Sequence, residues 1–412
     1  MLIGIDASRA YISDKTGTEN YSYHLINAML RLPEAKSHTF VLFIRPNTIV
    51  QKEIVGYSNV IVKEVKFKYL WTQVGLAWST RGKFSNLKFS NFQIEVLWVP
   101  AHTLPVLRRP GLKTVVTIHG LEYQWLPEYK NWLQKWYLPL STYYAAKYAD
   151  KLIAVSQFTA NQLKKELHTS SKKIKVVYEG VDFGQSEYSA IQSVRKPENQ
   201  LYQKFGITKK QYVLFVGTIQ PRKNLVALIE AFALIAKDLP GIKLVIAGAV
   251  GWDYEEVLRA PSRYGIQEKV VFTGRVGELE LSQLYQGAAL YVQPSITEGF
   301  GLPVLEAMAH KVPVVSSDGG ALNEVVGDGG VLVNLKSQMP NPLRSEASSQ
   351  IGDDFAMRLA DAMKEVLSSK KRQDSLNSMG LKRVKSFTWE KAAKDSLEVI
   401  VGEGYNRKSV KS

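Results

Sequence analysis

The sequence contains no cysteine. Disulfide scaffolds, thiolate nucleophiles and cysteine-ligated zinc sites are therefore excluded. No apolar run is long enough for a secretory signal or a membrane span, and the first residues, MLIGIDAS, lead directly into a strand-like pattern. We therefore expect a soluble protein that stays in the cytoplasm, with the inner face of the cell membrane as its candidate place of attachment.

Several motifs of common enzyme classes are also missing. There is no GxxxxGK[ST], which excludes a P-loop NTPase, and no GxGxxG after the first strand, which argues against a nicotinamide dehydrogenase. No segment resembles a Ser-His-Asp nucleophile elbow. Asp-x-Asp, the metal-binding motif of metal-dependent sugar transferases, does not occur, and the six histidines lack metal-ligand spacing. We therefore expect no metal and no cofactor.

The 412 residues are too many for one ordinary core, and the hydrophobic fraction of 45% is that of a globular protein. Short apolar runs alternate with helical stretches in both halves. The runs are 2–8, 39–45, 60–65, 96–100, 114–119, 152–156 and 174–182, followed by 212–217, 244–248, 270–274, 290–295, 313–318 and 330–334. Apolar strands that alternate with helices predict parallel sheets covered on both faces.

This pattern predicts an α/β protein with two doubly wound, Rossmann-like domains that face a cleft. We place the N-terminal domain at 1–183 and the second domain at 205–386. The polar segment 184–204 reads as a linker. The tail, 387–412, contains an amphipathic helix with apolar residues at Ala393, Leu397, Ile400 and Val401.

The formal net charge is +15, and most of it lies in the first half of the chain. Basic clusters stand near 66–71, 81–89, 164–165 and 172–175, and aromatic residues interleave with the first two. Solvated protein surface, attachment to an anionic membrane and nucleic-acid binding are all compatible with this charge. Nucleic acid is the least favoured, because there is no arginine-rich stripe and no recognised module.

The segment VGTIQPRKNL (216–225) predicts an anion site. A strand ends at Gly217, a short turn carries Arg222 and Lys223, and a helix begins near Asn224. Backbone N–H groups at a helix start attract anions, and two cationic side chains strengthen such a site. The alternative is that the Arg-Lys pair is ordinary solvated charge.

The segment TEGFGLPVLEAMA (297–309) carries two glutamates. Pro303 suits the first turn of a helix, which places Glu306 in that turn as a dipole-stabilised carboxylate. Glu298 precedes a glycine turn whose backbone can approach a ligand closely, and such a carboxylate can accept sugar or ribose hydroxyls. The two carboxylates could therefore hold one small polar ligand.

Two features of the first half complete the candidate set. His119 ends the apolar run TVVTIH, so its imidazole should reach the edge of the sheet, although a hydrogen-bonded structural histidine is an equal alternative. Gly17 and Thr18 form a flexible turn that leads into a helix after the first strand, again with N–H groups available.

Together these segments resemble the GT-B glycosyltransferases of family 4, the group 1 glycosyltransferases of retaining E-x7-E type. The resemblance covers nearly the whole chain and is most specific in PSITEGFGLPVLEAMAHKVPVVSSDGGALNEVVGDGG (294–330). It continues in VGTIQPRKNL, VIAGAVGWDYEEV, VVFTGRV, VTIHG, AVSQFTANQL and VVYEGVD. It implies that the tail helix crosses back onto the first domain.

The resemblance also implies roles for the candidate residues. Arg222 and Lys223 would bind the pyrophosphate of a sugar nucleotide in the loop after Gly217, and Glu306 would accept the ribose hydroxyls. Glu298 would face the transferred sugar. The remaining assignments are Gly299, Phe300, Gly301 and Leu302 beside that sugar, Gly17 and Thr18 at the phosphates, His119 between sugar and acceptor, and Arg275 near the base.

Members of this family retain anomeric configuration and need no metal. The implied activity is transfer of a hexose, of mannose or glucose type, from a UDP- or GDP-sugar to a cell-surface glycan or lipid-linked acceptor during polysaccharide biosynthesis. Two alternatives stay open: a soluble sugar or sugar-phosphate acceptor, and a catalytically silent sugar-nucleotide-binding protein. The sequence departs from the family pattern at Gly120, where Asp is usual, at Asn323, where Pro is common, and at Thr218, where some members carry a third cation.

Overall fold

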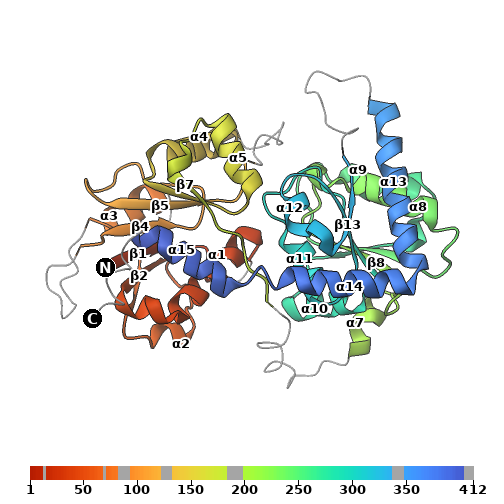
Figure 1. Ribbon diagram of the computed structural model, residues 1–412, viewed down its shortest axis with the longest axis horizontal. Helices are drawn as coiled ribbons and strands as arrows, with labels where there is room; N and C mark the ends of the chain where they lie inside the picture. The colour runs from red at the N-terminus through yellow and green to blue at the C-terminus, as the bar shows by residue number, and fades with distance from the viewer. Residues whose placement is uncertain are drawn as a thin grey trace. The chain divides into compact units, whose positions relative to one another are not determined.

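The computed structural model describes residues 1–12, 15–67, 71–81, 93–121, 132–182, 198–335 and 348–402. They form two compact units, each built on its own parallel sheet (Figure 1). The first unit contains Met1–Gly180 together with Phe387–Ser412, and the second contains Val181–Ser386. The predicted α/β fold with two parallel-sheet domains is confirmed, because every predicted apolar run overlaps a strand of one of the two sheets.

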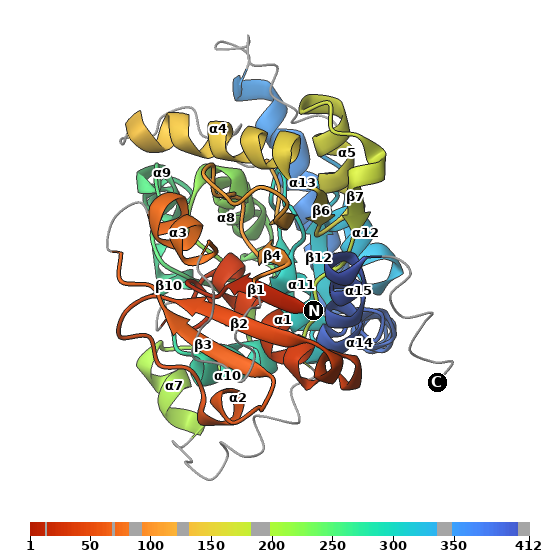
Figure 2. The same cartoon turned by 90° about the vertical axis from the view of Figure 1, so that its left-hand side faces the viewer.

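The first sheet has seven parallel strands in the order β3-β2-β1-β4-β5-β6-β7, and Figure 2 shows β1, β2 and β3 lying next to one another. The strands are β1 (Leu2–Asp6), β2 (Thr39–Ile44), β3 (Val60–Glu64), β4 (Val96–Val99), β5 (Lys113–Ile118), β6 (Lys151–Ala154) and β7 (Ile174–Val176). β1 and β4 are buried along their whole length. Central parallel strands are covered on both faces, which explains why they read as unbroken apolar runs.

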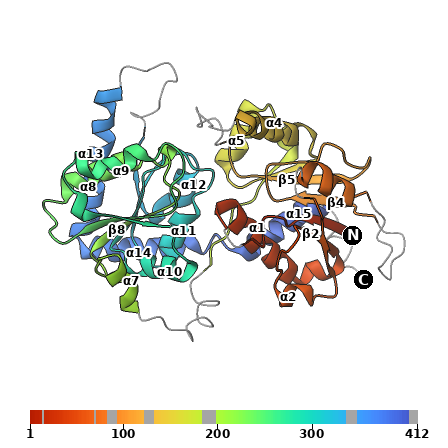
Figure 3. The same ribbon diagram turned by 180° about the vertical axis from the view of Figure 1, so that it is seen from behind.

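The α-helices that the structure describes in the first unit are α1 (Gly17–Arg31), α2 (Lys52–Val55), α3 (Ala77–Ser79), α4 (Trp132–Tyr148), α5 (Gln157–Glu166) and α15 (Trp389–Val401). The tail helix α15 packs against α1, β4 and β6, and Figure 3 shows α1 and α15 side by side. Of its four predicted apolar residues, Ala393, Leu397 and Ile400 are buried and Val401 is half-buried. A Cβ on Gly180 would lie 2.2 Å from the Trp389 backbone nitrogen, so the start of α15 requires glycine there.

The second sheet has six parallel strands in the order β10-β9-β8-β11-β12-β13. They are β8 (Tyr212–Val216), β9 (Lys243–Ala247), β10 (Val270–Gly274), β11 (Leu290–Gln293), β12 (Val314–Ser317) and β13 (Val331–Val333). The strand order reverses between β8 and β11. Ligands of open parallel sheets bind beyond the carboxyl ends of the strands at such a reversal. The loops after β8 and β11 are therefore the expected site of this unit.

The helices of the second unit are α7 (Glu198–Lys204), α8 (Leu225–Ile235), α9 (Glu255–Arg263), α10 (Glu278–Gly287), α11 (Leu302–Ala309), α12 (Leu322–Val326), α13 (Ser348–Ser368) and α14 (Lys370–Val384). α8 buries Leu228, Ile229 and Phe232 against the apolar side chains of β8, β9 and β11, and α13 packs beside α8.

The predicted linker requires one correction. Its last residues form α7, which packs against α10 of the second unit and therefore belongs to that unit rather than to a connection. The remainder of the linker, residues 184–197, lies outside the described part of the chain.

Candidate active site

The loop after β8 begins at a glycine of positive φ and passes close to the backbone after β9. Gly217 has a φ of 152°, and a Cβ on Gly248, after β9, would lie 2.1 Å from the Gly217 carbonyl oxygen. The chain then makes the 3-10 turn Pro221–Lys223 and enters α8 through Asn224, whose φ of 54° is left-handed. Asn tolerates this conformation better than most residues. The predicted strand, turn and helix around Arg222 and Lys223 are thus confirmed.

Arg222 and Lys223 both meet Glu298, from the loop after β11. Arg222 Nη1 lies 2.7 Å from Glu298 Oε2, and Lys223 Nζ lies 2.5 Å from Glu298 Oε1. The three side chains are 11%, 10% and 7% exposed. The alternative of solvated surface charge is therefore wrong. Two cations that share one buried carboxylate leave a net positive charge, which suits an anionic ligand.

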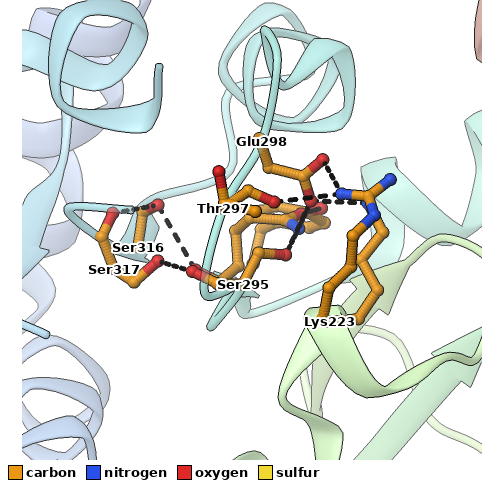
Figure 4. A network of polar contacts seen from close by, with 9 residues as sticks. Lys223, Ser295, Thr297, Glu298, Ser316 and Ser317 are labelled. Carbon is orange, nitrogen blue, oxygen red and sulfur yellow. Dashed lines mark hydrogen bonds and ion pairs between the residues drawn. The ribbon is translucent and has the colours of Figure 1, made fainter. Parts of the chain in front are cut away.

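Two neutral donors complete the contacts of Glu298. Ser295 Oγ donates to Glu298 Oε1 at 2.6 Å, and Gln293 Nε2 donates to the same oxygen at 3.1 Å. Figure 4 shows the side chains of Ser295, Glu298 and Lys223 converging between the two loops. Burial by itself raises the pKa of Glu298, but the Arg222 and Lys223 charges and the hydrogen bonds from Lys223 and Ser295 outweigh it and hold the pKa below the ordinary glutamate value. Glu298 is therefore an ionised, fully engaged carboxylate.

A second glycine turn, at Gly320 after β12, packs against the backbone of the Glu298 loop. Ala321 N donates to the Glu298 carbonyl at 2.9 Å. Gly320 has a φ of 65°, and a Cβ there would lie 2.5 Å from that same carbonyl oxygen. Ser317 Oγ donates to the Ser295 carbonyl on the same side (Figure 4). The segment after β12 thus fixes the backbone that carries Glu298.

The glycine turn after Glu298 leads into α11. Gly299 and Phe300 are buried, whereas Gly301 and Leu302 are half-buried. Gly301 is the N-cap with a φ of 112°, and α11 begins at Leu302. The prediction that Glu306 lies in the first helical turn is wrong, because the helix starts early enough to put Glu306 in its second turn. The dipole at the helix start therefore does not account for this carboxylate.

Glu306 is held by a side chain of α10 instead. Tyr285 Oη donates to Glu306 Oε2 at 2.7 Å. Burial raises the pKa of Glu306, the Tyr285 hydrogen bond opposes the rise, and the Asp182 charge adds to it. Glu306 is a partly buried carboxylate that keeps one oriented donor.

Of the other predicted residues, Gly17, Thr18 and His119 lie in the first unit and Arg275 lies in the second. Gly17 and Thr18 are the first two residues of α1 rather than a turn before it, and the Thr16 N–H donates to Glu19 Oε2 at 3.2 Å in a capping box. In the second unit, Arg275 is exposed directly after the edge strand β10, two strands from β8 in the sheet order.

His119 follows β5 with its side chain 13% exposed. Its Nε2 lies 2.9 Å from the Pro100 carbonyl, its Nδ1 lies 3.3 Å from Glu179 Oε1, and the Tyr21 ring packs edge-on against it. Both ring nitrogens of His119 therefore face oxygen atoms. Burial, then the nearby His119, lowers the pKa of His102 to about 3, so the neighbouring ring is neutral.

The structure thus joins Arg222, Lys223 and Glu298 in one cluster. It also adds residues that the sequence patterns did not single out. Gln293 and Ser295 could have been noticed as polar residues that end an apolar strand, whereas Tyr285 and Glu179 gave no local signal. Among the described residues, no group of three or more His, Asp or Glu side chains is arranged to hold a metal ion. In the same part of the chain, no helix combines the length and apolar character of a bilayer span.

Two family models match this chain. The model described as "Glycosyltransferase Family 4" matches residues 16–185, and "Glycosyl transferases group 1" matches residues 198–339. An O-antigen chain mannosyltransferase B from Escherichia coli is 27% identical over 68% of this chain and 67% of its own length. A D-inositol 3-phosphate glycosyltransferase from Segniliparus rotundus is 28% identical over 60% of this chain and 50% of its own length.

Solved structures agree in fold. HepE from Anabaena, crystallised with UDP and glucose, has a TM-score of 0.65 and 16% identity over 97% of this chain and 99% of its own. The two models divide the chain much as the two sheets do, one model on each parallel-sheet unit. The chain therefore belongs to the group 1 glycosyltransferases of family 4 and has the GT-B fold.

Proposed function

We propose that this protein is a retaining, metal-independent glycosyltransferase that moves a mannose- or glucose-type hexose from a UDP- or GDP-sugar to a cell-surface glycan or lipid-linked acceptor. The observation that carries this proposal is the cluster of Arg222, Lys223 and Glu298 at the strand reversal of the second sheet. The cluster pairs an excess of positive charge with a carboxylate, which suits the pyrophosphate and the sugar hydroxyls of one donor.

The proposed donor roles are those that the family resemblance implies. Arg222 and Lys223 bind the pyrophosphate, Glu306 accepts the ribose hydroxyls, and Glu298 with the turn from Gly299 to Leu302 contacts the sugar. Arg275 is assigned to the base. In the first unit, we assign Gly17 and Thr18 to the donor phosphates and His119 to the sugar and acceptor.

In the reaction, the bond between the sugar C1 and the phosphate oxygen breaks and a bond from C1 to the acceptor oxygen forms on the same face. The departing phosphate takes the acceptor proton. Arg222 and Lys223 stabilise the charge that develops on the departing nucleotide. Glu298 does not act as a nucleophile, because its carboxylate is ionised but engaged by four donors. Mass spectrometry of protein trapped with donor should show no glycosyl adduct on Glu298.

Metal independence is part of the proposal, since the two cationic side chains supply the positive charge that a divalent ion would bring. Transfer measured with excess EDTA should match transfer without it. A rate that falls with EDTA and returns with Mg²⁺ or Mn²⁺ would contradict this part.

The exposed face of α4 favours a lipid-linked acceptor at an anionic membrane. Tyr137, Leu140 and Tyr143 are 43%, 61% and 47% exposed on this helix. Lys147 lies over the rings of Tyr143 and Tyr148, at 5.8 and 5.4 Å. Aromatic and apolar side chains interleaved with cations suit the headgroup region of an anionic bilayer. Residues 68–70 and 82–89 of the predicted basic clusters 66–71 and 81–89, and residues 122–131 of the aromatic segment before α4, lie outside the described residues.

Sedimentation with vesicles of phosphatidylglycerol and phosphatidylcholine tests this attachment. The wild type should bind at low salt and dissociate at high salt, and Leu140→Ser with Tyr143→Ser should bind more weakly. Leu258→Ser, at an exposed leucine of α9, is the matched control and should bind like the wild type. Absence of wild-type binding at low salt would remove the membrane from the proposal.

A soluble acceptor is the second candidate, favoured by the similarity to an inositol-phosphate glycosyltransferase. Purified protein should be assayed for donor hydrolysis and transfer with UDP- and GDP-sugars, beside Lys223→Ala and Glu306→Ala. Turnover that both variants abolish supports the proposed site. Tight donor binding without turnover on lipid-linked or soluble acceptors would instead identify a silent sugar-nucleotide-binding protein.

A further inference from the structure

Tyr285 of α10 connects this helix to α11 through a hydrogen bond to Glu306. Its side chain is buried, with 1% relative exposure, and its hydroxyl donates to Glu306 Oε2 at 2.7 Å. Because the ring is buried, its hydroxyl donates to the Glu306 carboxylate from one fixed direction.

The Tyr285 ring is itself held on two sides. The His310 ring stacks on it at 5.3 Å with an interplanar angle of 21°, and the Tyr291 ring lies tilted at 5.8 Å. His310 Nδ1 lies 2.8 Å from the Glu306 carbonyl, and Ser282 Oγ lies 3.0 Å from His310 Nε2. Because a carbonyl only accepts, Nδ1 carries the proton and Nε2 accepts from the serine.

The spacing of the four polar residues in the sequence explains how α10 and α11 contact each other. Ser282 and Tyr285 are three residues apart on α10, and His310, the C-cap of α11, follows Glu306 by four residues. Such spacings place side chains on one face of a helix. Each helix therefore presents two polar groups to the other, and the Tyr285 hydroxyl has a fixed position.

We infer that Tyr285 is a positioning residue for donor binding: it orients the Glu306 carboxylate and keeps it ionised, ready to accept the ribose hydroxyls of a nucleoside diphosphate. This inference rests on the proposed function, because it assigns the ribose to Glu306. Only an ionised carboxylate offers both oxygens as acceptors.

The surroundings of Glu306 favour its protonated form, so the hydrogen bond from Tyr285 is needed to keep the carboxylate ionised. Burial and then the Asp182 charge raise the pKa of Glu306, and the Glu306 charge in turn helps to raise the pKa of Tyr291, after burial. His310 contacts the Glu306 backbone rather than its carboxylate, and burial lowers the pKa of that histidine, which leaves it neutral. Tyr285 is thus the side chain that opposes protonation, and its loss should raise the pKa of Glu306 further.

Tyr285→Phe tests the inference in two ways. The affinity of UDP and GDP, measured by calorimetry from pH 5.5 to 8.5, should fall roughly tenfold or more at the acid end and recover toward the wild-type value as pH rises. In transfer assays the donor KM should rise while kcat changes little. The unfolding midpoint should show the opposite pH trend: the deficit of the variant should grow as pH rises, because more of Glu306 must ionise without its donor.

Two controls separate positioning from packing. Tyr264→Phe removes a hydroxyl that donates to Glu230 Oε2 at 3.0 Å in the same unit, and should leave nucleotide affinity unchanged. Glu306→Gln should weaken binding equally at every pH. A loss of affinity in Tyr285→Phe that does not vary with pH, or no loss at all, would overturn the inference. If neither nucleotide binds the wild type, the proposed function fails, and the pH trend of unfolding still decides whether Tyr285 keeps Glu306 ionised.

Discussion

Arg222 and Glu298 stand 76 positions apart in the sequence, yet Arg222 Nη1 and Glu298 Oε2 lie 2.7 Å from each other. Lys223 reaches the other oxygen of the same carboxylate. The pairing arises because β8 and β11 are neighbours in the sheet, so the loops that follow them share one edge. Glu298 therefore pairs with both of the cations that we propose for the donor pyrophosphate.

Glu298→Gln should therefore tighten the binding of free UDP or GDP while it abolishes or strongly reduces transfer. Removing the negative charge leaves both cations to the pyrophosphate, and we expect a gain on the order of tenfold, or ~1.4 kcal/mol. Calorimetry at low and high salt measures the affinity, and the gain should shrink at high salt. Weaker nucleotide binding by this variant would show that the Glu298 carboxylate contributes to nucleotide binding rather than competing with the pyrophosphate for the two cations.

Lys223→Met should destabilise the second unit as well as weaken donor binding. The substitution keeps a long apolar stem but leaves a buried carboxylate with one cation, and breaking such a buried pair costs about 3–5 kcal/mol. Urea unfolding measures the free energy. Lys364→Met removes an ion pair with Asp238 in which both side chains are about half exposed, and should change stability little because water screens it. Equal effects of the two substitutions would contradict a buried cluster.

The pH dependence of stability should also reveal Glu298. Its pKa is lowered in the folded protein, so its contribution is present above the ordinary glutamate value of 4.5 and is lost as pH falls through the folded value. The difference in free energy of unfolding between wild type and Glu298→Gln should therefore be constant near neutral pH and shrink below about pH 4.5. Urea titrations across this range provide the measurement. A difference that stays constant into acid would mean that the cations do not stabilise the ionised form.

Gly320→Ala should displace the loop that carries Glu298. The new Cβ would meet the Glu298 carbonyl oxygen at 2.5 Å, in addition to the strain of a φ of 65°. Gly265→Ala is the matched control, since its φ of 67° is nearly the same and nothing lies within 4 Å of its Cβ position. The Gly320 variant should lose about 1–3 kcal/mol more stability than the control and most of its activity. Calorimetric unfolding and transfer rates, compared between the two, isolate the clash from the backbone strain.

Much of the fold could be predicted from the sequence because its signals are local. Each strand is a short apolar run, and runs that alternate with helices specify parallel sheets. The turn around Arg222 was also predictable, since the glycine that ends the strand, the proline of the turn and the start of the helix are all adjacent in sequence. The place of Glu306 in its helix was not predictable. The helix begins at Leu302, with Gly301 as its N-cap, one residue before the proline that suggested the start.

The sequence by itself determined two parallel α/β sheets, the loops that carry charge after their strands, and the family to which the chain belongs. Only the tertiary structure decided that Glu298 sits on both cations, that Tyr285 rather than a helix dipole holds Glu306, and that Glu179 faces His119. These pairings join residues from different strands and helices. Sheet order and helix packing bring such residues together over long sequence separations, and no local pattern of apolar and polar residues encodes which partner each one meets.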